Sequence, residues 1–77
     1  MNNHYESQST KNLSGMLAIA DGLSDFKSCD EIIDVLRERH PEVRRATFEW
    51  AKNGSFEGER DLHQLVLKVC SRVANHG

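Results

Sequence analysis

Apolar residues recur every three or four positions along most of the chain, a period that predicts helices rather than strands. Four such stripes occupy about residues 11–23, 28–40, 41–53 and 57–74. No stretch alternates apolar and polar residues in the way that a half-buried strand does, and no hairpin turn separates two such stretches. The sequence therefore predicts an all-α fold, a small bundle of about four short helices.

The second and third helices have the clearest predicted boundaries. Ser28 and Glu31 have the spacing of a capping box, in which each side chain bonds the backbone N–H of the other residue. Pro41 can begin a helix but cannot continue one, so we expect one helix to end directly before it and another to begin there. Asn53 and Gly54 are typical of a helix C-terminus. The middle of the chain should thus be a helix, a sharp corner and a second helix.

The first helix is the least regular, because Gly15 and Gly22 interrupt it and glycine weakens a helix interior. Its apolar stripe is Leu13, Met16, Leu17, Ala20 and Leu23. Residues 1–10 are polar and show no periodicity, so we expect a flexible tail that orders, if at all, on a partner. Residues 11–77 are then a single helical domain.

Two large aromatic side chains stand in the third helix. Trp50 lies on the apolar stripe, and we expect it to pack in the core between the second and fourth helices. Phe48 lies off the stripe, beside Arg44, Arg45 and Lys52. It is interpreted either as a second core contact or as an exposed interface aromatic. Small cores recruit most large side chains, which favours the core contact.

Two cysteines, Cys29 and Cys70, both lie on apolar stripes, where a free thiol behaves as a small hydrophobic group. Buried free thiols indicate a reducing compartment. The first residues lack the basic and apolar regions of a signal peptide, and no apolar run approaches the ~18 residues of a membrane helix. These features predict a cytoplasmic protein without a membrane partner.

Catalytic and metal-binding motifs are absent from the sequence. The histidines and cysteines do not have the spacing of a zinc site, and no phosphate-binding loop or hydrolase motif occurs. Cys29 stands near a helix N-terminus, but the neighbouring Asp30 and Glu31 oppose a thiolate. Short helices also leave little room for a cleft. We therefore expect no enzyme, no metal and no cofactor.

Four of the ten basic residues surround the corner before Pro41, namely Arg37, Arg39, Arg44 and Arg45. One interpretation is a DNA-binding transcriptional regulator, in which about residues 29–53 form a helix-turn-helix. The third helix of the chain would be the recognition helix, and Arg39, His40, Arg44, Arg45 and Phe48 would face the major groove. However, Glu38, Glu42 and Glu49 alternate with the arginines, and the net charge of the chain is −2. These carboxylates would repel phosphate, which weakens the DNA interpretation.

The leading hypothesis is therefore a small non-enzymatic regulatory protein that acts by binding another protein. Its predicted partner-binding residues are Arg39, Arg44, Arg45, Phe48 and Lys52. The regular stripe of residues 57–74 also suggests a homodimer, since a small core gains much from self-association. The predicted dimer interface is Leu62, Leu65, Val66, Leu67 and Val69. The alternative is a monomer in which this last helix is the central one.

Overall fold

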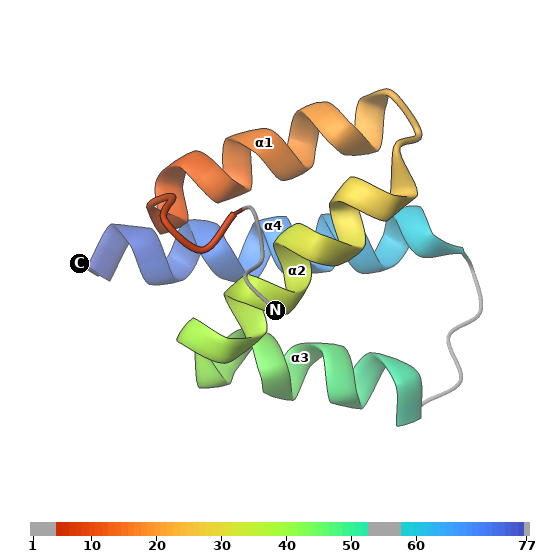
Figure 1. The fold of residues 1–77 in the computed structure, drawn as a ribbon. Coiled ribbons are helices and arrows are strands. Elements are labelled where there is room, and N and C mark those ends of the chain that lie inside the picture. The colour runs from red at the N-terminus through yellow and green to blue at the C-terminus, as the bar shows by residue number, and fades with distance from the viewer. Residues whose placement is uncertain (1–4, 53–57, 77) are drawn as a thin grey trace.

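The computed structural model describes residues 5–52 and 58–76, apart from the side chains of residues 59 and 74–76. It confirms the predicted all-α bundle, and no strand occurs in this described part of the chain (Figure 1). The four helices are α1 (Thr10–Gly22), α2 (Phe26–Arg39), α3 (Pro41–Lys52) and α4 (Glu59–His76). None of these helices is both long and apolar enough to cross a membrane.

The two middle positions of the bundle belong to α2 and α4. In Figure 1, α2 crosses in front of α4, while α1 lies on one side of this pair and α3 on the other. The outer helices α1 and α3 each contact both α2 and α4, and among the described residues they do not contact each other. Each outer helix therefore joins α2 to α4, and these two helices touch each other only in a small area.

Twelve apolar residues form one buried cluster to which every helix contributes. They are Leu13, Leu17, Ala20, Cys29, Ile32, Ile33, Val35, Leu36, Val43, Val66, Val69 and Cys70. All twelve lie on or directly beside the predicted stripes, because the period of the sequence matches the turn of the helix. Two expectations about the core were wrong. Leu23 lies past the end of α1 and is exposed, and Trp50 is half-buried rather than enclosed.

The first helix ends in a Schellman motif. The N–H of Asp25 donates to the carbonyl of Ala20 at 2.9 Å, and the N–H of Ser24 donates to the carbonyl of Asp21 at 3.1 Å. This geometry needs a left-handed residue, and Ser24 takes that place with a φ of 58°. Glycine usually stands there, because a β-carbon is strained in this conformation.

Replacing Ser24 with glycine should give a more stable chain than replacing it with alanine, by about 1 kcal/mol. Both variants lose the hydroxyl that accepts from the Arg60 guanidinium at 2.7 Å, so their difference isolates the strain of the β-carbon. Urea unfolding followed by circular dichroism measures the two free energies. Equal values would show that this position is not left-handed in solution.

The start of α2 differs from the predicted capping box. The helix begins at Phe26, and its N-cap is Asp25, whose carboxylate accepts from the backbone N–H and the hydroxyl of Ser28 at 3.4 and 2.8 Å. Ser28 therefore lies inside the first turn, and the cap predicted for it was wrong. Two cap signals stand three residues apart, and the Schellman motif selects the earlier one because it already places Asp25 at the helix entrance.

The corner before Pro41 is confirmed. His40 is the extended residue between the helices, with φ −125° and ψ 110°, and its N–H closes the last turn of α2 on the Leu36 carbonyl at 2.9 Å. The chain then turns back into α3 (Figure 1). The predicted C-cap at Asn53-Gly54 and the predicted start of the last helix at residue 57 lie outside the described residues.

Candidate binding surfaces

Arg39, predicted to contact a partner, is turned onto the chain's own N-terminal segment. Its guanidinium donates to the backbone carbonyls of Glu6 and Gln8. The neighbouring His40 also faces inward, and its Nε2 lies 2.8 Å from the hydroxyl of Thr10 at the start of α1. The two residues therefore join the corner to the beginning of the fold.

The N-terminal segment packs against the helices from Tyr5 onward. The Tyr5 side chain is half-buried against the core, and its carbonyl accepts the N–H of Gln8 at 3.1 Å in a tight turn. Ser9 then caps α1 by accepting the N–H of Asn12 at 3.1 Å. The segment predicted as a flexible tail therefore packs against the helices from residue 5 onward, and its residues 1–4 lie outside the described residues.

The outer face of α3 carries the most exposed aromatic ring in the described chain. Phe48 is 66% exposed, so the expected core contact was wrong and the exposed-aromatic interpretation is the one confirmed. Arg44 and Lys52 stand one turn before and one turn after it, which places all three on one face of the helix. We call Arg44, Phe48 and Lys52 the α3 face.

The two adjacent arginines of α3 point to different neighbours. Arg44 donates to the carbonyl of Arg37 at 3.2 Å, in the last turn of α2, where carbonyls lack partners within the helix. Arg45 instead lines a hollow of about 380 Å³ between α3 and α4. Two carboxylates and a second guanidinium share that hollow, from Glu42, Glu49 and Arg72. The basic cluster seen in the sequence is therefore divided, and one part of it has mixed charge.

The predicted dimer interface on α4 lies partly inside the protomer. Val66 and Val69 belong to the buried core, whereas Leu62, Leu65 and Leu67 are half-buried beside it. A second chain would therefore meet only the three leucines of this set. The α4 dimer stays a prediction, reduced to those side chains.

A buried pair of polar side chains, which the sequence reasoning missed, joins α1 to α4. His63 is fully buried, and its Nδ1 lies 2.8 Å from Oδ1 of Asp21. A carboxylate can only accept, so Nδ1 carries the shared proton. Gln64 donates to the other Asp21 oxygen at 3.4 Å, and the Phe26 ring lies 5.8 Å from the imidazole, centre to centre. Asp21 and His63 both lie on apolar stripes of the sequence. A polar residue at such a position is the signal from which the pair could have been predicted.

An aspartate that holds a histidine by its Nδ1 also occurs in catalytic triads. The Nε2 atom of His63 is buried and has no hydrogen-bond partner within the described part of the chain. A general base must reach the proton that it removes. In this structure the pair joins α1 to α4.

Both cysteines are buried free thiols, as predicted. Burial raises the pKa of the Cys70 thiol from its usual 9.0 to about 11. Thiolates, not thiols, are the reactive form, so Cys70 is poorly suited to nucleophilic or redox chemistry. Within the described residues, no group of three or more histidine, cysteine, aspartate or glutamate side chains could hold a metal ion.

The raised pKa makes the stability of the fold depend on alkaline pH. The unfolded chain releases the Cys70 proton near pH 9 and the folded chain only near pH 11, so the thiol's contribution is complete below pH 9 and is lost as the pH rises through this window. We expect the stability of the parent chain, relative to Cys70→Ala, to fall by about 1–2 kcal/mol between those values. Urea unfolding of the parent chain and of Cys70→Ala, at several pH values between 9 and 11, measures this fall in stability. A constant difference would contradict the burial of the thiol.

Comparison with known proteins gives no relative: no family model, no curated protein and no solved structure matches the chain.

Proposed function

We propose that the chain is a small non-enzymatic interaction protein, which regulates another protein by binding it through the α3 face. The observation that carries this proposal is the exposure of Phe48 in the middle of a cationic helix face. A large aromatic ring left in water loses the free energy that burial would give it. Aromatic and arginine side chains are also the groups that most often dominate binding at protein interfaces.

The side chains of the α3 face indicate which kind of protein surface would bind it. The Phe48 ring would be buried in an apolar pocket of the partner. The cations of Arg44 and Lys52, on either side of the ring, would pair with carboxylates at the rim of that pocket. Arg44 already lies over the carbonyl end of α2, which limits its motion and lowers the entropy lost on binding. An acidic protein surface with a central apolar depression therefore fits best.

Two observations favour a protein over DNA as the partner. Arg39 and His40, which a helix-turn-helix would present to the groove, are bonded to the N-terminal segment and to α1. Arg45 stands among Glu42 and Glu49, whose charges oppose a phosphate backbone. A protein surface can match such a mixed pattern of charges, whereas a uniformly negative duplex cannot.

The proposal is tested by placing a photo-crosslinking amino acid at position 48, in place of Phe48, in cells of the organism that produces this chain. We expect a discrete covalent product with one protein, and we expect Arg44→Ala with Lys52→Ala to remove it. The matched control places the same crosslinker at Asp30, an exposed position on α2. The absence of any product, or identical products from both positions, would overturn the proposal.

A binding measurement with duplex DNA tests the alternative function, that of a DNA-binding regulator. If the alternative were right, the purified chain would bind a random duplex at low salt, and binding would weaken steeply as salt rises. Arg44→Ala with Arg45→Ala would then abolish it. The present proposal expects no such binding, and a strong salt-dependent complex would overturn it in favour of a DNA-binding regulator.

A further inference from the structure

Four exposed charged side chains form a row along α3, on the side of the helix that is turned away from the core. They are Glu42, Arg45, Glu49 and Lys52, and they follow one another at spacings of three, four and three residues. This spacing places them on one face of the helix, opposite the residues of α3 that are buried. We call these four residues the charged row. Its charges alternate in sign from one end to the other.

The charges of the row are not paired within the protomer. The ion pairs of the described residues lie within α2 and between α1 and α4. No ion pair among the described residues joins two members of the charged row, although Arg45 and Glu49 have a spacing at which a helix allows one. All four charges are therefore available to a binding partner.

Two further cations lie near the charged row, and each has acceptors close by. Arg44 is turned toward α2, where it donates to the carbonyl of Arg37 at 3.2 Å. Arg72 of α4 lines the same hollow as Glu42 and Glu49, so carboxylates stand beside it. Neither cation changes the alternation of the row itself. A partner that covers the row must therefore carry alternating charges in the opposite order.

A second copy of α3 has this opposite order when it runs antiparallel to the first. Glu42 and Lys52 lie equally far from Thr47 in the sequence, on either side of it. The same is true of Arg45 and Glu49. A twofold axis at the level of Thr47 therefore places each Glu42 opposite a Lys52 of the other copy, and each Arg45 opposite a Glu49. Every facing pair has opposite charges, whereas a parallel pair in register would oppose like charges.

Phe48 gives the same arrangement an apolar contact. Its ring is 66% exposed and lies along one side of the charged row. In an antiparallel pair of helices, one side of each helix meets the same side of the other, so the two Phe48 rings approach each other. Rings packed in this way remove apolar surface from water. On the other side of the row, the small Ala46 and the hollow beside it leave room for side chains of the second copy.

We propose that two copies of the chain associate through antiparallel α3 helices, joined by ion pairs between their charged rows and by their Phe48 rings. This interface differs from the dimer predicted on α4. It does not rest on the proposed binding of another protein. However, it covers Phe48, so the dimer and the partner-bound chain exclude each other. Self-association would thus limit the amount of chain whose α3 face is free to bind.

Sedimentation of the full chain at low salt, over a wide concentration range, tests the proposal. We expect a mass that rises from 8.8 kDa to twice that value. Arg45→Glu and Glu49→Arg each oppose like charges, so each should raise the dissociation constant by about tenfold or more. Asp30→Arg is the matched control, because it changes the net charge as Glu49→Arg does, at an exposed position of α2, and it should dimerise like the parent. A parent chain that is monomeric at every concentration, or a dimer that withstands both reversals, would overturn the proposal.

A mixture of the two variants separates loss of association from loss of folding. In a mixed dimer of Arg45→Glu with Glu49→Arg, the new carboxylate faces the new guanidinium, and the retained Glu49 faces the retained Arg45. We therefore expect the equimolar mixture to dimerise about as tightly as the parent, which a misfolded chain could not do. A mixture that stays monomeric would contradict the antiparallel pairing. A parent dimer that is lost only in Leu67→Asp would assign the interface to α4 instead.

The crosslinker at position 48 distinguishes the dimer from the proposed partner. A product with twice the mass of the chain reports the dimer, and a product with a different protein reports the partner. Glu49→Arg should remove the first product and keep the second, because it leaves the three residues of the α3 face unchanged. Each proposal can therefore fail without the other.

Discussion

Replacing Leu36 with alanine is expected to lower the free energy of unfolding by about 2–5 kcal/mol. Leu36 is fully buried in α2, which, like α4, contacts all three other helices. Removing its side chain takes away apolar contacts and leaves a cavity that four helices, fixed by one another, cannot easily close. A chain of this length has a total stability of only about 4–12 kcal/mol, so the loss is a large part of it.

Urea unfolding followed by far-ultraviolet circular dichroism measures this loss, at a low concentration that favours the monomer. The matched control is Leu23→Ala, which makes the same chemical change at a position that is 74% exposed, and it should change the stability by less than about 0.5 kcal/mol. Similar effects from the two variants would mean that the core is not centred on α2.

Features that depend on near neighbours in the chain could be predicted from the sequence. The helical stripes follow from a period of three to four residues, and the buried set agrees with them. The corner at Pro41 follows from the geometry of proline itself. The error at the start of α2 was also local, since Asp25 and Ser28 are both good caps and only the Schellman motif decides between them.

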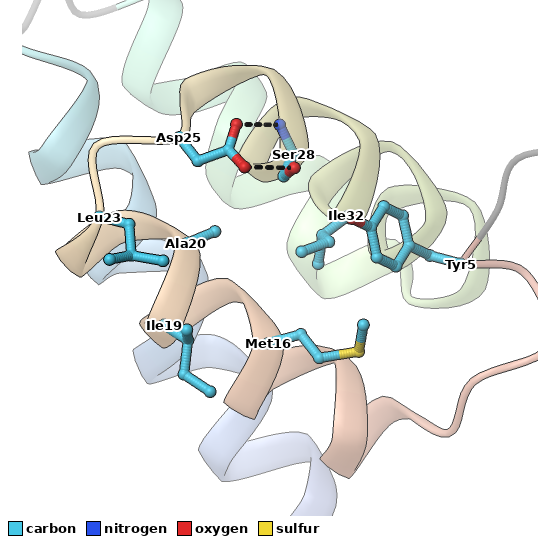
Figure 2. A pocket seen from close by; sticks show the side chains of 8 residues that line it. All are labelled: Tyr5, Met16, Ile19, Ala20, Leu23, Asp25, Ser28 and Ile32. Atoms are coloured by element: carbon cyan, nitrogen blue, oxygen red, sulfur yellow. Dashed lines mark hydrogen bonds between the residues drawn. The ribbon is translucent and has the colours of Figure 1, made fainter.

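Features that depend on distant contacts could not be predicted. Arg39 bonds the carbonyl of a residue 31 positions earlier, and no local pattern marks an arginine that will do so. Phe48 stayed ambiguous because its exposure depends on which face of α3 the other helices cover. A hollow between α1 and α2 is likewise lined by Tyr5, which lies far from α2 in the sequence (Figure 2).

The buried pair of His63 and Asp21 lies between these two cases, because each residue interrupts an apolar stripe and the two are 42 positions apart. Considered alone, each residue is a polar side chain on the apolar face of its helix, where burial would be unfavourable. A buried polar group is costly unless it is paired, so two such interruptions of complementary chemistry indicate a contact between their helices. Pairing them would have placed α1 against α4 from the sequence alone.

The pair should also give the second-largest effect of a single substitution. Asp21→Ala leaves the Nδ1 hydrogen of His63 without an acceptor, in a fully buried ring whose Nε2 already lacks a hydrogen-bond partner among the described residues. We expect a loss of about 2–4 kcal/mol in the free energy of unfolding. Asp21→Asn keeps an oxygen in place to accept this hydrogen, so it should cost only about half as much.

A double-mutant cycle shows whether this loss arises from the unpaired imidazole. In Asp21→Ala with His63→Leu, both polar groups are gone and no buried donor is left unsatisfied, so the double variant should be more stable than Asp21→Ala alone. The expected interaction energy between the two positions is about 1–3 kcal/mol, measured by urea unfolding of all four chains. Additive losses would show that the two side chains do not interact in solution, and that the contact between α1 and α4 rests on apolar packing alone.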